Sequence, residues 1–126
     1  MPIIGIGVDL ARISRIASSL ERYGERFTNR IFHPLEMEHS RKRKKNAEFL
    51  AACFAVKEAT LKAFGDFPGR AVAWSDIYIT HEPTGKPVLH LEGNAKKLGE
   101  EKGVKRCHVS ITHDGDLALA QVILEN

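Results

Sequence analysis

Three residues that could do chemistry lie far apart in the sequence. Asp9 follows an apolar segment near the N-terminus, whereas Glu58 and Lys62 stand four residues apart in a segment rich in Ala and Leu. Mg²⁺ usually takes one or two protein carboxylates and leaves its other positions to water and phosphate oxygens. A lysine one helical turn from a carboxylate can then neutralise a phosphate. The set therefore indicates metal-assisted phosphoryl chemistry, provided that the fold brings Asp9 to Glu58.

The same residues also fit a structural interpretation. Glu58 and Lys62 could form an exposed ion pair along a helix, worth about 0.3–0.5 kcal/mol. His113 is a further candidate, since it ends a predicted strand beside a turn, where an imidazole can serve as acid, base or phosphate donor. Many such histidines only form hydrogen bonds at the surface. The remaining histidines show no metal-ligand spacing; they are His33, His39, His81, His90 and His108.

The long helix and the first strand are the elements that must position these groups. Residues 3–8 are continuously apolar apart from glycine and predict a buried strand that delivers Asp9 at its end. Residues 46–64 predict a helix with Asn46 as a possible N-cap and Gly65 after the last turn. Helical spacing makes four of its side chains candidates for burial, namely Phe49, Cys53, Val56 and Leu61.

The other segments predict an α+β fold in which an antiparallel sheet packs on one long helix with shorter helices. A helix is expected from Ile13 to Leu20 with Gly24 as its stop, and a second short one from Pro34. Turn residues then separate short strands and one surface helix. These are a hairpin of 77–81 and 88–91, a helix over 94–102, and a hairpin of 107–113 and 117–124 around Asp114-Gly115-Asp116.

Length and composition bound the class of protein. The chain has 126 residues, of which 43% are hydrophobic and 28% charged, so we expect one domain over residues 1–126. It has no apolar run of membrane-spanning length and no signal peptide, which predicts a cytoplasmic protein. The two cysteines, Cys53 and Cys107, lack zinc-site spacing, and we interpret them as reduced packing residues.

Basic residues concentrate in one segment. The net charge is +3, and residues 41–45 read Arg-Lys-Arg-Lys-Lys, which is either a surface for an acidic partner or a solvated loop. Nucleic-acid binding is disfavoured because no aromatic residue interleaves with the run. A dinucleotide-binding motif is excluded as well, because the third glycine after Gly5 and Gly7 would be residue 10, which is Leu10.

Four segments form a recognisable pattern when the number of residues between them is taken into account. They are Gly5-Ile6-Gly7-Val8-Asp9-Leu10 with Arg15-Ile16; Glu48-Phe49-Leu50-Ala51; Phe54-Ala55-Val56-Lys57-Glu58-Ala59 with Lys62-Ala63-Phe64-Gly65; and His108-Val109-Ser110-Ile111-Thr112-His113 with 118–124. In these segments the chain resembles the bacterial holo-[acyl-carrier-protein] synthases, which are small 4′-phosphopantetheinyl transferases. The resemblance covers nearly the whole chain.

The resemblance implies an enzyme of fatty acid biosynthesis. It would transfer the 4′-phosphopantetheine group of coenzyme A to a serine of apo acyl carrier protein and release adenosine 3′,5′-bisphosphate. Asp9 and Glu58 match the family's Mg²⁺ ligands, and Lys62 and His113 match residues beside coenzyme A. The serine proton would pass to Glu58, or to Asp9 through a bound water, and the sequence leaves both open.

Further sites follow from the same resemblance. Lys44, Lys45 and Gly65 would join Lys62 and His113 at the coenzyme A site. Arg15 would meet the carrier protein. The family also implies a homotrimer with active sites between subunits, and no nucleic-acid or membrane partner.

Two departures from the family pattern concern the coenzyme A site. Cys53 stands where the family commonly has arginine, which would remove one phosphate contact. Residues 66–70 differ from the usual loop and would reshape either the pantetheine channel or the contact with the carrier protein.

Two other functions remain compatible with the residues. The carboxylates could serve another Mg²⁺-dependent phosphodiester enzyme such as a nuclease, although position 60, where many metal nucleases have lysine, is Thr60. Alternatively, residues 41–45 could form a non-catalytic basic binding module.

Overall fold

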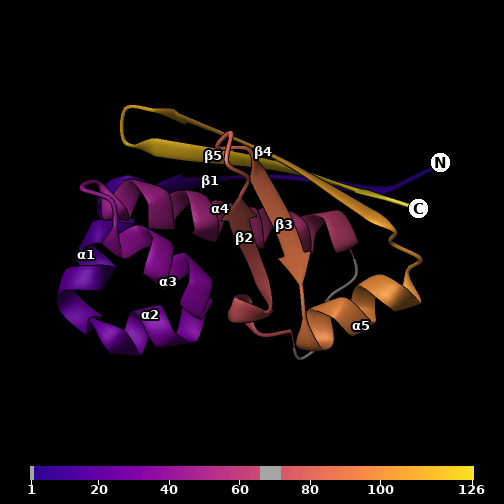
Figure 1. Cartoon of the computed structure of the whole chain (residues 1–126), viewed down its shortest axis with the longest axis horizontal. Coiled ribbons are helices and arrows are strands. Elements are labelled where there is room, and N and C mark those ends of the chain that lie inside the picture. Colours follow the sequence, from indigo (N-terminus) through magenta and orange to yellow (C-terminus); the bar gives the residue numbers. More distant parts are fainter. Residues whose placement is uncertain (1, 66–71) are drawn as a thin grey trace.

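A three-stranded antiparallel sheet lies along the long helix α4 (Asn46–Phe64) in the computed structural model, which describes residues 2–65 and 72–126 (Figure 1). Its strands are β1 (Ile3–Arg12), β5 (Leu117–Glu125) and β4 (Arg106–Asp114), in that spatial order. The hairpin of β2 (Ile77–His81) and β3 (Pro87–Leu91) forms a second sheet. The predicted α+β class and both predicted hairpins are confirmed.

Shorter helices occupy the two ends of the molecule. Helices α1 (Ile13–Tyr23), α2 (Glu25–Ile31) and α3 (Pro34–Arg41) lie at one end, and α5 (Gly93–Glu101) at the other (Figure 1). A 3₁₀ turn, η1 (Trp74–Asp76), precedes β2. Helix α2 was not expected from the sequence, whereas Gly24 ends α1 as predicted, with φ of 55°. Lys45, not Asn46, is the N-cap residue of α4, and Asn46 is its first helical residue.

Strand β1 differs from the sequence prediction in length and burial. It continues through Asp9 to Arg12 and pairs with β5 along its length, so Asp9 lies within the strand. The prediction of a buried strand over residues 3–8 was wrong, because the large apolar side chains face outward and are about half exposed. They are Ile3 at 56%, Ile6 at 56%, Val8 at 50% and Leu10 at 55%. The inward face of β1 carries small residues instead.

Gly5 and Gly7 explain how β1 and α4 approach each other. A Cβ atom at Gly7 would lie 1.8 Å from the carbonyl oxygen of Ala59, and one at Gly5 would lie 1.7 Å from that of Ala63. Both distances are far inside contact range, so the helix backbone occupies the space that a side chain would need. Because Gly5, Gly7 and Asp9 alternate along the strand, they share the face toward α4. The close packing therefore places Asp9 beside the helix.

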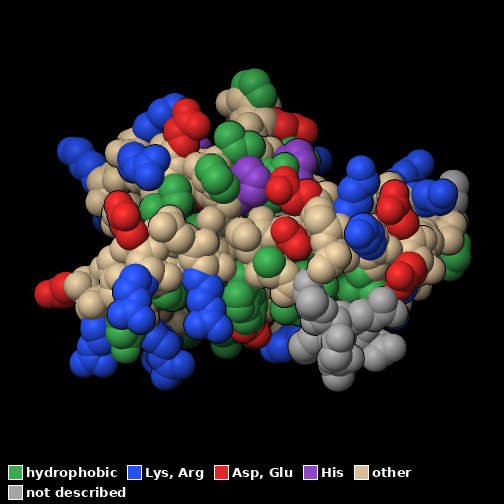
Figure 2. Space-filling view, turned by 90° about the horizontal axis from the view of Figure 1, so that it is seen from below, with side chains coloured by type: hydrophobic (Ala, Val, Ile, Leu, Met, Phe, Trp, Pro, Cys, Tyr) green, Lys and Arg blue, Asp and Glu red, His purple; other side chains and the backbone are tan. Residues whose placement is uncertain are grey.

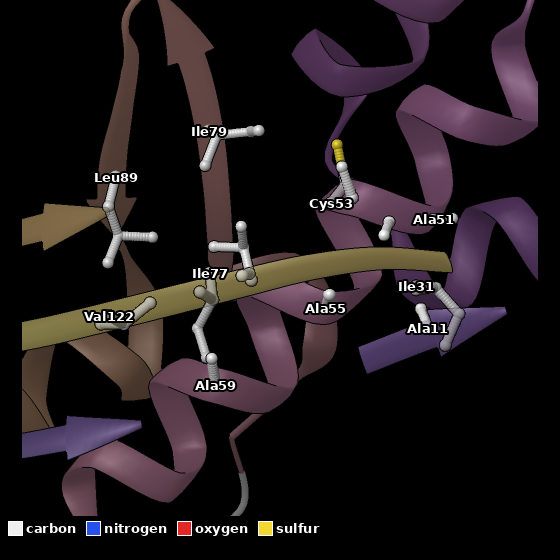
Figure 3. Packing of buried hydrophobic residues seen from close by; sticks show 14 of the residues in the cluster. Ala11, Ile31, Ala51, Cys53, Ala55, Ala59, Ile77, Ile79, Leu89 and Val122 are labelled. Carbon is white, nitrogen blue, oxygen red and sulfur yellow. The ribbon is translucent and has the colours of Figure 1, made fainter. Parts of the chain in front are cut away.

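The hydrophobic core lies between α4 and the two sheets (Figure 3). Small residues of α4, among them Ala51, Ala55 and Ala59, let the helix pack tightly against its neighbours. Ile77 and Ile79 of β2 and Val122 of β5 contribute the larger side chains. Phe49, Cys53 and Val56 are buried as predicted, while Leu61 is only partly buried.

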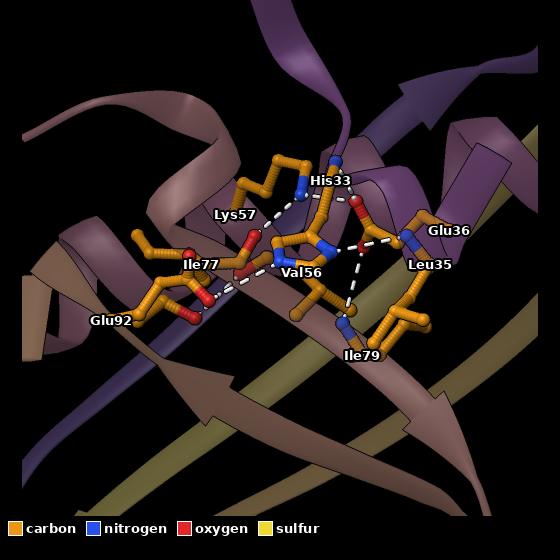
Figure 4. Close-up of polar contacts among 9 residues, drawn as sticks. His33, Leu35, Glu36, Val56, Lys57, Ile77, Ile79 and Glu92 are labelled. Atoms are coloured by element: carbon orange, nitrogen blue, oxygen red, sulfur yellow. Dashed lines mark hydrogen bonds and ion pairs between the residues drawn. The ribbon is translucent and has the colours of Figure 1, made fainter.

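A buried ion pair joins α3, α4 and β2. The side chains of Lys57 and Glu36 are fully buried, and Lys57 Nζ lies 2.6 Å from Glu36 Oε1 (Figure 4). Lys57 also donates to the carbonyl oxygen of Ile77, 2.5 Å away, and Ile79 N donates to Glu36 Oε2 at 3.1 Å. His33 N also donates to Glu36 Oε1, at 3.0 Å. These contacts let two charges remain inside the core.

We expect Lys57→Met to lower the free energy of unfolding by about 3–5 kcal/mol, because it leaves the Glu36 carboxylate buried without its counter-charge. Urea denaturation measures the change. The control is Lys86→Met at an exposed turn residue, for which we expect a change within about 0.5 kcal/mol. An equal effect of the two substitutions would contradict the interpretation of the buried pair.

Candidate active site

The structure brings Asp9, Glu58 and Lys62 together where β1 crosses α4. Lys62 Nζ lies 2.8 Å from Asp9 Oδ1 and 3.4 Å from the carbonyl oxygen of Val8. The Lys62 side chain is 53% exposed and that of Asp9 15% exposed, so the group opens to solvent on the lysine side. Glu58 stands one turn before Lys62 on α4 and is partly buried. Two segments distant in the sequence thus form one polar cluster.

The electrostatics of the cluster are those of two carboxylates sharing one cation. Partial burial and the neighbouring charge of Asp9 raise the pKa of Glu58, and Lys62 offsets part of this rise. The hydrogen bond and charge of Asp9, together with the charge of Glu58, raise the pKa of Lys62. A raised carboxyl pKa means that the ionised form is disfavoured here. The site would therefore gain from an additional positive charge.

The donors present fit Mg²⁺ better than a transition metal. Among the described residues, no group of three or more His, Cys, Asp and Glu side chains is arranged to hold a metal ion. Mg²⁺ does not need such a group, since one or two carboxylates plus water and substrate phosphate oxygens complete its shell. Asp9 and Glu58 would supply two hard oxygen ligands on neighbouring elements. The pair therefore fits a cation whose remaining positions are taken by water or phosphate oxygens.

His113 lies in a separate part of the chain's surface. It is the penultimate residue of β4 and faces the first half of α4, with its Nε2 atom 3.9 Å from Glu48 Oε1. Glu48 and Glu58 are ten residues apart on α4, which corresponds to about 15 Å along the helix axis. Strand β5 also separates β4 from β1. Within one chain, the structure does not bring His113 to the Asp9 cluster.

His113 instead lines a cleft of about 470 Å³ near the start of α4. The side chains of Glu48 and Phe49 contribute from α4, and the turn between β2 and β3 contributes Gly85. Three further residues line the cleft: His39, Arg43 and His81. The sequence interpretation gave the two histidines no role and included Arg43 only in the basic segment 41–45. His39 and His81 have no ligand spacing in the sequence, and only the fold stacks their rings, with centroids 4.7 Å apart.

The remaining predicted site residues line neither the cleft nor the Asp9 cluster. Lys44 and Lys45 are exposed in the turn before α4, and neither lines the cleft. Gly65 ends α4 with φ of 79°, three residues beyond Lys62. Arg15 is exposed on α1 beside a shallow hollow that also includes Arg22. The predicted change in the 66–70 loop falls outside the described residues.

Cys53 lies in the hydrophobic core and does not line the cleft. Its side chain is fully buried, and its thiol lies near Glu36 rather than in the cleft. Burial and the charge of Glu36 raise the pKa of the thiol. Cys53 is therefore a core residue that stays protonated, in agreement with the packing role expected from the sequence.

Comparisons with known proteins found relatives that match this chain over nearly its full length. A family model described as the 4′-phosphopantetheinyl transferase superfamily matches residues 5–122. Holo-[acyl-carrier-protein] synthase of Solibacter usitatus is 45% identical over 124 residues, covering 98% of this chain and 99% of that protein. The corresponding protein of Trichlorobacter lovleyi is 44% identical over 123 residues, with 98% of each chain covered.

Solved structures show the same fold. Holo-[acyl-carrier-protein] synthase from Neisseria meningitidis superimposes with a TM-score of 0.90 at 34% identity, covering 99% of this chain and all of that one (100%). The Helicobacter pylori protein, solved in complex with coenzyme A, gives a TM-score of 0.82 at 28% identity, with coverage of 95% and 99%. The cluster on β1 and α4, the family match and the full-length relatives lead to one conclusion: this chain belongs to the 4′-phosphopantetheinyl transferase superfamily.

Proposed function

We propose that this chain, acting as one domain over residues 1–126, transfers the 4′-phosphopantetheine group of coenzyme A to a serine of apo acyl carrier protein in fatty acid biosynthesis. The observation that carries the proposal is the cluster of Asp9, Glu58 and Lys62, in a chain related over its full length to holo-[acyl-carrier-protein] synthases. The serine oxygen bonds to the phosphorus that carries pantetheine as the bond to the other phosphate breaks. Adenosine 3′,5′-bisphosphate leaves.

Each residue of the cluster has a distinct part in this reaction. Asp9 and Glu58 would hold Mg²⁺, which when bound supplies positive charge beside the pyrophosphate. Lys62 extends toward solvent, where its ammonium group neutralises phosphate oxygens and the charge on the departing phosphate. The serine proton would pass to a carboxylate, either Glu58 itself or Asp9 through a bound water.

The carrier protein would dock on the surface of α1 and α2. Arg15 and Arg22 line one hollow on α1, and Arg26 and Arg30 are exposed on α2. Figure 2 shows Lys and Arg side chains gathered at the end of the molecule where Figure 1 places these helices. A basic surface of this kind attracts an acidic partner and steers its approach, an effect that weakens with salt.

A homotrimer would bury the outward face of the sheet. Half-exposed Ile6, Val8 and Leu10 lie beside Ile123 and Leu119 of β5 and form an apolar surface that a monomer would leave in water. In the proposed assembly, the His113 cleft of one subunit would lie toward the Asp9 cluster of the next. Within one chain the two places are separated, so only a contact between subunits can bring them together. Three copies related by rotation close such a ring.

We expect Val8→Glu to convert the trimer to monomers, because three carboxylates would have to enter the apolar interface without counter-charges. Sedimentation equilibrium measures the mass, and circular dichroism checks that the monomer remains folded. The control is Lys97→Glu at an exposed position of α5, which should leave the mass unchanged. A wild-type monomer, or a trimer that tolerates Val8→Glu, would overturn the proposed interface.

A cytoplasmic location completes the proposal, since coenzyme A and acyl carrier protein are soluble substrates. In the part of the chain that the structure describes, no helix has the length and apolar character needed to span a bilayer.

The transferase activity is tested by intact-mass spectrometry. Apo acyl carrier protein is incubated with the wild-type protein, coenzyme A and Mg²⁺. We expect the carrier protein to gain the mass of one phosphopantetheine, and the gain to disappear when EDTA replaces Mg²⁺. No gain with any of several carrier proteins would reject the proposed reaction.

A further inference from the structure

The turn between β4 and β5 contacts the start of α1, the helix that carries Arg15. The turn and the helix lie at the same end of the molecule (Figure 1). Ile13 N donates to the carbonyl oxygen of Asp116 at 2.8 Å, and Ser14 N donates to Asp116 Oδ1 at 2.8 Å. Ser14 Oγ donates to Asp116 Oδ2 at 2.5 Å. A residue 102 positions away from Ser14 in the sequence therefore holds the junction between β1 and α1.

The start of α1 has no cap of its own. Arg12 is the N-cap residue, and its side chain makes no capping hydrogen bond to the described part of the chain. The first turn carries no acidic residue, and Arg12 and Arg15 place positive charge where the helix dipole favours a negative one. Asp116 supplies what the local sequence lacks, namely an acceptor for a first-turn N–H group and a negative charge.

The contact with Asp116 orders the first turn and not the whole helix. Hydrogen bonds from the side chain and backbone of Ser14, together with the charge of Arg12, lower the pKa of Asp116, so the carboxylate is ionised at neutral pH. The rest of α1 is anchored by its apolar face, where Ile16 is buried and Leu20 packs against the core. Loss of the Asp116 carboxylate should therefore loosen the first turn and leave the helix folded.

The first turn carries one of the two arginines that line the hollow on α1. Arg15 directly follows Ser14, whereas Arg22 stands seven residues later in the last turn. Residues seven apart lie on the same helical face, so both arginines belong to the surface on which the carrier protein would dock. Only Arg15 depends on the order of the first turn.

We propose that Asp116 is a positioning residue for the carrier protein, because its carboxylate orders the first turn of α1 and thereby holds Arg15 ready for docking. The inference rests on the proposed function. A purely electrostatic role would have the opposite sign, since Asp116 is a negative charge beside a surface for an acidic partner. Removing that charge would strengthen docking, whereas loss of positioning weakens it.

Steady-state kinetics with apo acyl carrier protein and coenzyme A test the proposal. We expect Asp116→Ala to raise KM for the carrier protein about fivefold, the factor that corresponds to loss of one N-cap. Asp116→Asn removes the same charge but keeps a side chain that caps helices as well as Asp, so KM should stay within about twofold of the wild-type value. An unchanged or lower KM in Asp116→Ala would overturn the proposal, as would equal effects of Ala and Asn.

Two controls show that the effect is confined to α1. KM for coenzyme A should stay within about twofold in Asp116→Ala, which checks that the end of the hairpin carrying His113 has not moved. Asp114→Ala, at an exposed carboxylate of the same hairpin end, should change neither KM by more than about twofold. A parallel rise of both KM values in Asp116→Ala would indicate a general distortion and contradict the positioning role.

Double-mutant cycles show whether Asp116 acts through Arg15. In an Arg15→Gln background, Asp116→Ala should raise KM for the carrier protein by less than about twofold, because the side chain to be positioned is absent. In an Arg22→Gln background, the rise should again be about fivefold. Equal effects in the two backgrounds would overturn the action through Arg15.

Amide hydrogen exchange, followed by NMR, tests the ordering of the first turn without a transfer assay. Asp116→Ala should speed exchange of the Ser14 amide about fivefold and leave that of Leu20 unchanged, whereas Asp116→Asn should affect neither. Unchanged exchange at Ser14 overturns the role of Asp116, whatever the transfer assay gives. If the wild-type protein modifies no carrier protein but Ser14 responds as expected, the proposed function and the docking role fail, while the ordering of α1 by Asp116 is supported.

Discussion

Glu58→Gln is expected to lower phosphopantetheine transfer by at least about 10²-fold, the usual contribution of one positioned acid–base group. The amide cannot accept the serine proton, and it is a weaker ligand for a hard cation than a carboxylate. Initial rates of mass gain on the carrier protein measure the loss. Glu100→Gln, at an exposed position of α5, is the matched control and should retain full activity.

Glu58→Gln should lower the transfer activity without lowering the stability of the protein. Because the pKa of Glu58 is raised in the folded protein, its ionised form is disfavoured there, and stability falls as pH rises from the ordinary pKa of Glu through the raised value. Removing this charge should leave the melting temperature at pH 7 unchanged or increase it. A variant with low activity and a clearly lower melting temperature would indicate a structural role for Glu58 instead of a catalytic one. Full activity would exclude Glu58 from the reaction.

Gly7→Ala is expected to destabilise the fold by more than about 3 kcal/mol, which is at the upper end of the range for single substitutions. The new Cβ would lie 1.8 Å from the carbonyl oxygen of Ala59, an atom of the α4 backbone that no side-chain rotation can move. Strand and helix would have to separate, and Asp9 would move away from Lys62. Urea denaturation and the transfer assay measure the two effects.

Gly85→Ala is the control for this substitution. A Cβ atom added at Gly85 would meet no described atom within 4 Å, but the φ of this residue is 93°, so the expected cost is only the backbone strain of about 1–2 kcal/mol. A Gly7→Ala protein as stable as the Gly85→Ala protein would show that β1 and α4 do not pack as closely as described.

Local sequence patterns determined most of the elements. The helix over 46–64 and its end at Gly65 were predictable because the segment lacks interior Gly and Pro and a glycine follows it. The hairpins were predictable from turn residues between short apolar segments, as at Asp114-Gly115-Asp116. Helix α2 was missed, because it begins directly after the glycine that ends α1.

The sequence also identified Asp9, Glu58 and Lys62 as a set, and their proximity in space agrees with it. Their residue types and the helical spacing of Glu58 and Lys62 suggested phosphoryl chemistry. The resemblance to a family then matched Asp9 and Glu58 to the family's Mg²⁺ ligands. The two glycines before Asp9 could be recognised from the sequence as part of a motif. Only the structure shows why glycine is needed there: the α4 backbone lies too close to β1 for a side chain.

Tertiary structure alone decided which face of β1 is buried and which charges meet. Lys57 and Glu58 are neighbours in the sequence, yet Lys57 is fully buried against Glu36 while Glu58 reaches the surface. Likewise, Arg43 enters the cleft and Lys44 does not. Hydrophobic and turn patterns act over a few residues and therefore determine local conformation. Burial and ion pairing depend on what packs against a residue from distant parts of the chain, and in this protein those contacts determine where the chemistry can take place.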